Sequence, residues 1–158
     1  MRVLTLAVTA AIFLSLLALA SAAEVTREAY VAAVEPICKA NTQANEKILK
    51  GVRGEVKAGK LKPAARQFAS AARALTKTRR ELATVPRPPA DRARLTKWLG
   101  YIKGEVELFE AAGRKLKAGD KTGAERMSVL LTHQANLAND AVLAFEFNYC
   151  HAEPSKFT

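Results

Sequence analysis

The chain has 158 residues and a formal net charge of +10, and it contains only two cysteines and two histidines. A Cys-x-x-Cys redox pair and the Cys-x-x-Cys-His attachment motif of c-type haem are both missing from the sequence. Neither His133 nor His151 follows a glutamate by three residues, so the Glu-x-x-His motifs of di-iron helical bundles are missing as well. The sequence therefore predicts a protein without a metal or cofactor.

The first 22 residues are typical of an export signal that is cleaved. Arg2 provides a positive start, residues 3–20 form an apolar run without a charge, and Ala20-Ser21-Ala22 is the small-x-small pattern that signal peptidase recognises. A retained membrane anchor is the alternative, because a run of roughly 18 apolar residues just spans a bilayer. We expect cleavage after Ala22 or Ala23. The rest, residues 23–158, is expected to form a single secreted or cell-envelope domain without a membrane span.

Apolar residues at helical spacing fill the remainder of the chain. The pattern predicts helices over residues 26–57, 61–84, 89–117 and 121–149, each with one apolar face. We identify no window with the strict two-residue alternation of a half-buried strand, so the fold class is all-α. The apolar face predicted for the last helix contains Met127, Leu130, Leu137, Ala141, Ala144 and Phe145.

Glycines and prolines mark the ends of these helices. Gly59 and Gly119 stand where a helix closes with a left-handed residue. Pro86, Pro88 and Pro89 separate the second helix from the third. Because all three connections are short, neighbouring helices should run antiparallel. The expected architecture is an up-down-up-down four-helix bundle.

Cys38 and Cys150 lie near the two ends of the exported domain, in a compartment where disulfides persist. We therefore expect one structural disulfide, and two buried free thiols are the alternative. Straight helices would place the two cysteines at levels roughly 15 Å apart, too far for a disulfide. Because an interior proline removes a helical hydrogen bond, helix one is predicted to kink near Pro36 and helix four to bend toward Cys38.

Side chains that could carry out catalysis are few. Ser70 and Ser128 lie in alanine-rich or apolar helical sequence, without the glycine elbow of a serine nucleophile. Glu105 and Glu107 fall on different faces of one helix, so they do not form a paired acid and base. We expect a non-enzymatic protein.

Basic residues concentrate at two corners that share one end of the predicted bundle. Few acids accompany them, mainly Asp120 and Glu125. This basic cap predicts binding of an anionic envelope polymer or lipid headgroups, although a charge run is also typical of a solvated face. Nucleic acid is disfavoured by export and by the lack of interleaved aromatic and basic residues. The basic cap comprises Lys50, Arg53, Lys57, Lys60, Lys62, Arg66, Arg114, Lys115, Lys117 and Lys121.

Aromatic side chains of the third and fourth helices suggest a second function. They could line an apolar pocket between helices, although core packing is their more common role. A small apolar-ligand carrier is therefore the alternative hypothesis, and it requires a cavity near Trp98 and Phe109. The rings in question are Trp98, Tyr101, Phe109, Phe145, Phe147 and Tyr149.

Two short boxes, Ile37-Cys38 with Asn41 and Phe147-x-x-Cys150, resemble a pattern seen in uncharacterised secreted helical-bundle proteins of actinobacteria. The resemblance covers the exported domain loosely. It implies a disulfide-closed helical bundle behind an export signal and transfers no activity. Many of those proteins carry a lipid-attachment cysteine, which this chain lacks. The oligomeric state is left open by all of these patterns.

Overall fold

The computed structural model of the protein describes residues 24–153. The predicted signal peptide, residues 1–22, and its cleavage site lie outside the described residues. The described part is helical and contains no strand, which confirms the all-α prediction. Most of it belongs to four long helices, α1 (Arg27–Ile48), α3 (Leu61–Thr84), α4 (Arg92–Lys117) and α5 (Lys121–Val142).

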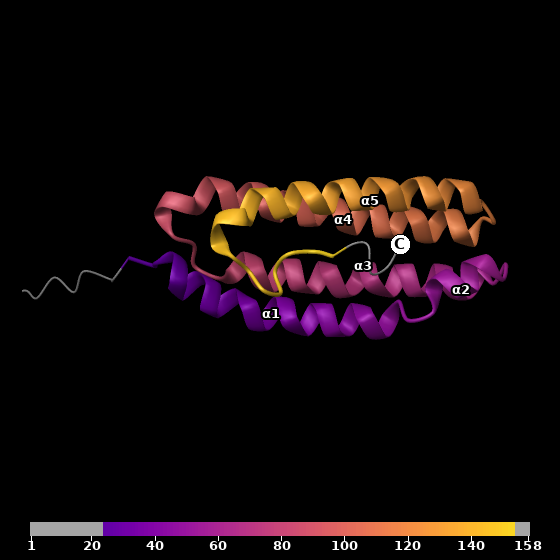
Figure 1. The fold of residues 1–158 in the computed structure, drawn as a ribbon, viewed down its shortest axis with the longest axis horizontal. Helices are drawn as coiled ribbons and strands as arrows, with labels where there is room; N and C mark the ends of the chain where they lie inside the picture. The colour runs from indigo at the N-terminus through magenta and orange to yellow at the C-terminus, as the bar shows by residue number, and fades with distance from the viewer. Residues whose placement is uncertain (1–23, 154–158) are drawn as a thin grey trace, which may run out of the picture.

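The four long helices lie side by side along the length of the molecule (Figure 1). α3 packs against both α1 and α4, and α4 packs against α5. Residues 24–153 also contain three short helices: α2 (Val52–Lys57) follows α1, η1 (Pro89–Asp91) precedes α4, and η2 (Leu143–Phe145) follows α5. Among the helices that the structure describes, none is both long and apolar enough to cross a lipid bilayer.

Glycines with positive φ form the corners of the fold. Gly59 and Gly119 have φ values of 72° and 80°, which confirms that they close helices in the left-handed conformation. A third such residue was not expected from the sequence. Gly51, with φ of 79°, divides the helix predicted over residues 26–57 into α1 and α2.

Much of the core comes from the apolar faces of α3 and α4. These faces bury Leu82, Leu95, Trp98 and Leu116, among other side chains. Burying each large apolar side chain stabilises the fold by about 1.5–3 kcal/mol. The face predicted for the last helix is correct only in part: Phe145 is buried and Met127 and Ala141 pack against the core, but Leu130 is 47% exposed and Ala144 is also exposed. α5 instead buries a face of smaller side chains, which lets it pack close to α4: Ala124, Leu131, Ala135, Ala138 and Val142.

The last predicted helix ends earlier than expected. α5 stops at Val142 rather than near residue 149, and Glu146 turns the chain with φ of 52°. Residues 146–153, which we call the strap, then run back along the bundle (Figure 1). This return brings Cys150 to Cys38, with their Cα atoms 5.0 Å apart, so the predicted disulfide is present. The expectation that helix four bends toward Cys38 is wrong, because α5 ends at Val142 and the chain then reverses to bring Cys150 next to Cys38.

Candidate functional site

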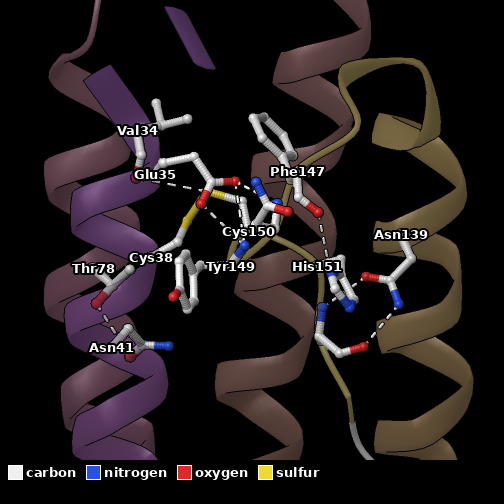
Figure 2. Close-up of a disulfide and its surroundings, with 12 residues drawn as sticks. Val34, Glu35, Cys38, Asn41, Thr78, Asn139, Phe147, Tyr149, Cys150 and His151 are labelled. Carbon is white, nitrogen blue, oxygen red and sulfur yellow. Dashed lines mark hydrogen bonds between the residues drawn. A yellow bond between two sulfur atoms is a disulfide. The ribbon is translucent and has the colours of Figure 1, made fainter. Parts of the chain in front are cut away.

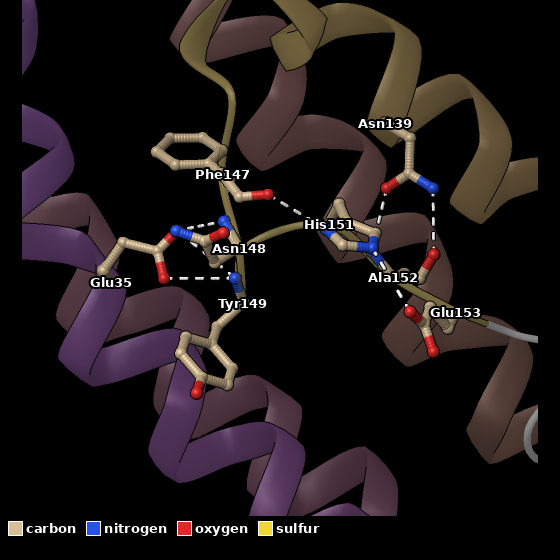
Figure 3. Close-up of polar contacts among 8 residues, drawn as sticks. All are labelled: Glu35, Asn139, Phe147, Asn148, Tyr149, His151, Ala152 and Glu153. Atoms are coloured by element: carbon tan, nitrogen blue, oxygen red, sulfur yellow. Dashed lines mark hydrogen bonds and ion pairs between the residues drawn. The ribbon is translucent and has the colours of Figure 1, made fainter.

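The strap lies between α1 and α5, and it is attached to both (Figure 2). The disulfide joins it to α1 through Cys38. One turn earlier on α1, the Glu35 carboxylate accepts hydrogen bonds from the backbone N–H groups of Asn148 (2.7 Å) and Tyr149 (3.1 Å). On the other side, the Asn139 side chain of α5 forms two hydrogen bonds with the backbone of Ala152, of 2.9 and 2.8 Å (Figure 3).

Aromatic stacking fixes the beginning of the strap. The Phe147 ring stacks on Trp98, with 5.6 Å between ring centroids, and on Phe145, with 5.3 Å. Tyr30 of α1 meets the edge of Phe145. Rings packed in this way contribute about 0.5–1.5 kcal/mol per pair beyond the area that they bury. Of these rings, Trp98 also lines the cavity between the helices.

Beside this cluster, the bundle holds a cavity of about 240 Å³ that is partly open to solvent. Its apolar wall includes Leu75 of α3, Trp98 and Phe109 of α4, and Leu131 of α5. The strap covers part of it with Tyr149 and the disulfide. The cavity reaches the surface in the seam between α1 and α5, because exposed residues of the strap and of α1, such as Glu46 and His151, also line it.

The wall of the cavity also carries buried polar side chains. Asn41 of α1 accepts a hydrogen bond from the hydroxyl of Thr78 on α3 (3.2 Å). One turn further on, the Asn45 side-chain N–H donates to the same Asn41 oxygen (3.5 Å). Asn45 Oδ1 is buried and has no hydrogen-bond partner among the described residues. A buried acceptor without a donor costs free energy, so this oxygen is a place where a ligand group would be stabilised.

Glu105 is the most unusual residue of the cavity. It is 7% exposed and lines the cavity from α4. The structure shows neither an ion pair nor a hydrogen bond for its carboxyl group with any residue of 24–153. Burial disfavours the charged form and raises the pKa of Glu105 from 4.5 to about 8. An isolated buried carboxyl group of this kind is often found at functional sites.

The structure brings together only some of the aromatic residues predicted to line a pocket. Trp98, Phe109 and Tyr149 line the cavity. Phe145 and Phe147 pack in the aromatic cluster instead. Tyr101 is half-buried and lies under Lys97, whose ammonium nitrogen is 5.6 Å from the ring centroid.

The basic cap residues are all exposed. The two corners that carry them, next to α2 and between α4 and α5, lie at the same end of the molecule (Figure 1). Three of the ten pair with nearby acids, Arg114 with Glu110, Lys115 with Asp120, and Lys121 with Glu125. Among the described residues, the other seven show no ion pair, so that end of the molecule has a surplus of positive charge.

The two histidines occupy different places. His133 is exposed on α5. His151 lies in the strap, where Nδ1 is 3.1 Å from the Phe147 carbonyl and Nε2 is 3.5 Å from a Glu153 carboxylate oxygen (Figure 3). Within residues 24–153, no three His, Cys, Asp or Glu side chains come together as a metal site.

Two features of the site were not predicted from the sequence, although both left a signal there. Glu105 falls on the same helical stripe as Ile102 and Phe109, so a carboxyl group in an apolar face was readable. Residues 145–149 read Phe-Glu-Phe-Asn-Tyr, a brief two-residue alternation that the helix predicted over residues 121–149 passed over and that is typical of extended chain. Phe145 at the end of η2 and Phe147 in the strap are both buried, whereas Glu146 and Asn148 are exposed.

No family model, curated protein sequence or solved structure matches this chain.

Proposed function

We propose that this protein is an exported carrier that binds a small, largely apolar molecule in the cavity between its helices. The observation that supports the proposal is a cavity of about 240 Å³ next to Trp98 and Phe109, the feature that this hypothesis required. Protein interiors are packed as densely as organic crystals, and voids larger than a water molecule are few. An engineered apolar cavity of about 150 Å³ is already large enough to bind benzene.

The strap supports the same proposal, because it covers a space that the helices leave unfilled. A buried cavity left by a large-to-small substitution destabilises a protein by roughly 24 cal/mol per Å³, so selection for stability alone would fill the enclosed part of this space with side chains. Here the wall retains small residues, Ala135 and Ala138, in positions where larger side chains would reduce the cavity.

Fluorescence tests the proposal directly. Trp98 lines the cavity and is the only tryptophan of the chain. The neutral probe N-phenyl-1-naphthylamine should bind with enhanced emission, and its binding should change the emission of Trp98. Ala135→Phe places a ring in the cavity and should weaken probe binding at least tenfold, whereas Asn136→Phe, on the exposed side of α5, should not. Probe binding that is absent, or equal in both folded variants, contradicts the proposal.

The basic cap supports a second candidate function, the association with anionic envelope polymers or lipid headgroups. Ten exposed basic side chains at one end, seven of them without an ion pair among the described residues, create a positive field that attracts such polymers. The two functions use separate surfaces, so one does not exclude the other.

In this proposal the protein works outside the cytoplasm, after cleavage of the signal at Ala22 or Ala23, as a single non-enzymatic domain. The Cys38–Cys150 bond is compatible with such a compartment. An up-down-up-down order of the helices and a kink of α1 near Pro36 belong to the same proposal. α1 is assigned as one continuous helix through Pro36.

A further inference from the structure

The cavity and the whole chain differ in charge. The chain has 25 basic and 15 acidic residues, yet none of the described residues that line the cavity is a lysine or arginine. Three acidic side chains line it instead, Glu46 from α1, Glu105 from α4 and Glu153 from the strap. Among the described lining residues, His151, next to Glu153, has the only side chain that can carry a positive charge.

Among the described residues of the cavity wall, the fully buried side-chain polar atom that lacks a partner is an acceptor, Asn45 Oδ1. Asn45 Oδ1 receives no hydrogen bond, while the side-chain N–H of Asn45 donates to Asn41. Glu105, once ionised, offers only acceptors, and the structure shows no donor for it among residues 24–153. A ligand that bonds both to ionised Glu105 and to Asn45 Oδ1 must therefore supply N–H or O–H donors.

Of the groups that donate hydrogen bonds, an ammonium group fits best. It supplies positive charge to the carboxylate, three N–H donors and no acceptor. The rings of Trp98, Phe109 and Tyr149 also line the cavity, and aromatic faces attract cations. Resting on the proposed carrier function, we infer that the ligand is an amine with an apolar body, and that its ammonium group binds Glu105, with Asn45 Oδ1 as a further acceptor.

This pairing makes binding depend on pH. In the free protein the Glu105 pKa is about 8, so most molecules hold a neutral carboxyl group at pH 7, and an ammonium ligand must displace its proton. Affinity should rise about tenfold between pH 7 and pH 9, because a primary amine with a pKa of about 10 stays charged. The other ionisable groups facing the cavity are Glu46 from α1 and Tyr149, His151 and Glu153 from the strap. α3 and α5 contribute the uncharged Thr78 and Asn139.

Three ligands with the same body and different heads test the inference: 4-phenylbutylamine, 4-phenylbutanol and 4-phenylbutyrate. Calorimetric titration of the full chain at pH 8.5, with Trp98 emission as a second signal, gives each dissociation constant. We expect the amine to bind at least tenfold more tightly than the alcohol, and the carboxylate to bind most weakly.

Glu105→Gln should bring the affinities for amine and alcohol within threefold of each other and remove the rise between pH 7 and pH 9. Glu46→Gln, at the exposed mouth of the cavity, is the matched control and should keep both properties. Equal affinities for amine and alcohol in the parent protein, or a preference that survives Glu105→Gln, would overturn the inference and leave the carrier function standing. Failure of both the amine and the alcohol to bind would overturn the carrier function as well.

Discussion

Glu105 is an ionisable group held where water reaches it poorly. Its pKa of about 8, against 4.5 in the unfolded chain, means that folding favours the protonated carboxyl group. Between these two values the folded protein keeps a proton that the unfolded chain has released. The free energy of unfolding must therefore fall as the pH rises through this window. Ionising Glu105 in the empty cavity lowers the stability of the folded protein, and a bound cation would offset this loss.

Glu105→Gln should remove this pH dependence, since a neutral amide cannot ionise. The parent protein should lose stability between pH 5 and pH 9, by at most about 5 kcal/mol from this one group, and the variant should lose much less. Urea unfolding at both pH values measures the difference. Glu107→Gln, an exposed position on the same helix that pairs with Lys103 at 3.2 Å, should retain the loss seen in the parent. Parallel behaviour of the parent and Glu105→Gln would show that the carboxyl group titrates normally.

At the scale of elements, the strap connects α1 with α5, the neighbouring pair of long helices that have few direct contacts with each other. It bridges part of the seam between α1 and α5, and it positions Phe147 on Trp98. The long loop closed by Cys38 and Cys150, a sequence separation of 112, makes the disulfide a substantial source of stability in the chain-entropy description.

Replacing both cysteines by serine should lower the free energy of unfolding by about 2–5 kcal/mol, while the far-ultraviolet circular dichroism of the helices stays close to that of the parent. Trp98 emission should shift to the red, because release of the strap opens Trp98 to water. Glu35→Gln, which keeps the disulfide and weakens the bonds to the amides of Asn148 and Tyr149, should show a smaller shift. Unchanged Trp98 emission in the double variant would mean that the strap does not cover the cavity.

Much of this architecture could be read from the sequence, because each of α3 and α4 has one apolar stripe that is clearly richer than the others. α5 was harder, since it has two apolar stripes, and the buried one is made largely of alanines that a hydrophobicity pattern ranks low. Its C-terminal end was misjudged because residues 143–149 are rich in apolar side chains that also suit helical spacing. The cavity could not be predicted, because it forms where the apolar faces of α1, α3, α4 and α5 meet, and the apolar pattern of one helix does not show how closely its face packs against the others.

At the scale of the whole molecule, positive charge collects at the basic cap and negative charge lines the cavity. The cap thus offers anionic polymers a contact that leaves the seam between α1 and α5 open. A carrier attached to an anionic envelope by its cap would still exchange its ligand.

Charge reversal tests the cap. Lys57, Lys60, Lys62 and Lys117 are exposed and show no ion pair among the described residues, so reversing all four to glutamate should leave the fold intact and abolish binding to anionic vesicles at low salt. Binding by the parent should weaken steeply near physiological salt, where the screening length is about 8 Å. Reversal of Arg79, Arg80, Arg92 and Arg94, which lie outside the cap, is the control and should weaken vesicle binding less. Equal losses would mean that only net charge matters.

The two edges of the strap are held by different kinds of bond. Toward α1 the attachment includes a covalent bond, whereas toward α5 the described residues show the two hydrogen bonds between Asn139 and Ala152. Opening in an oxidising compartment must therefore begin at the α5 edge and pivot about Cys150. The displaced strap stays tethered, at an effective concentration set by a few residues of chain. Reclosure is thus a first-order step, and its rate is independent of how dilute the protein is.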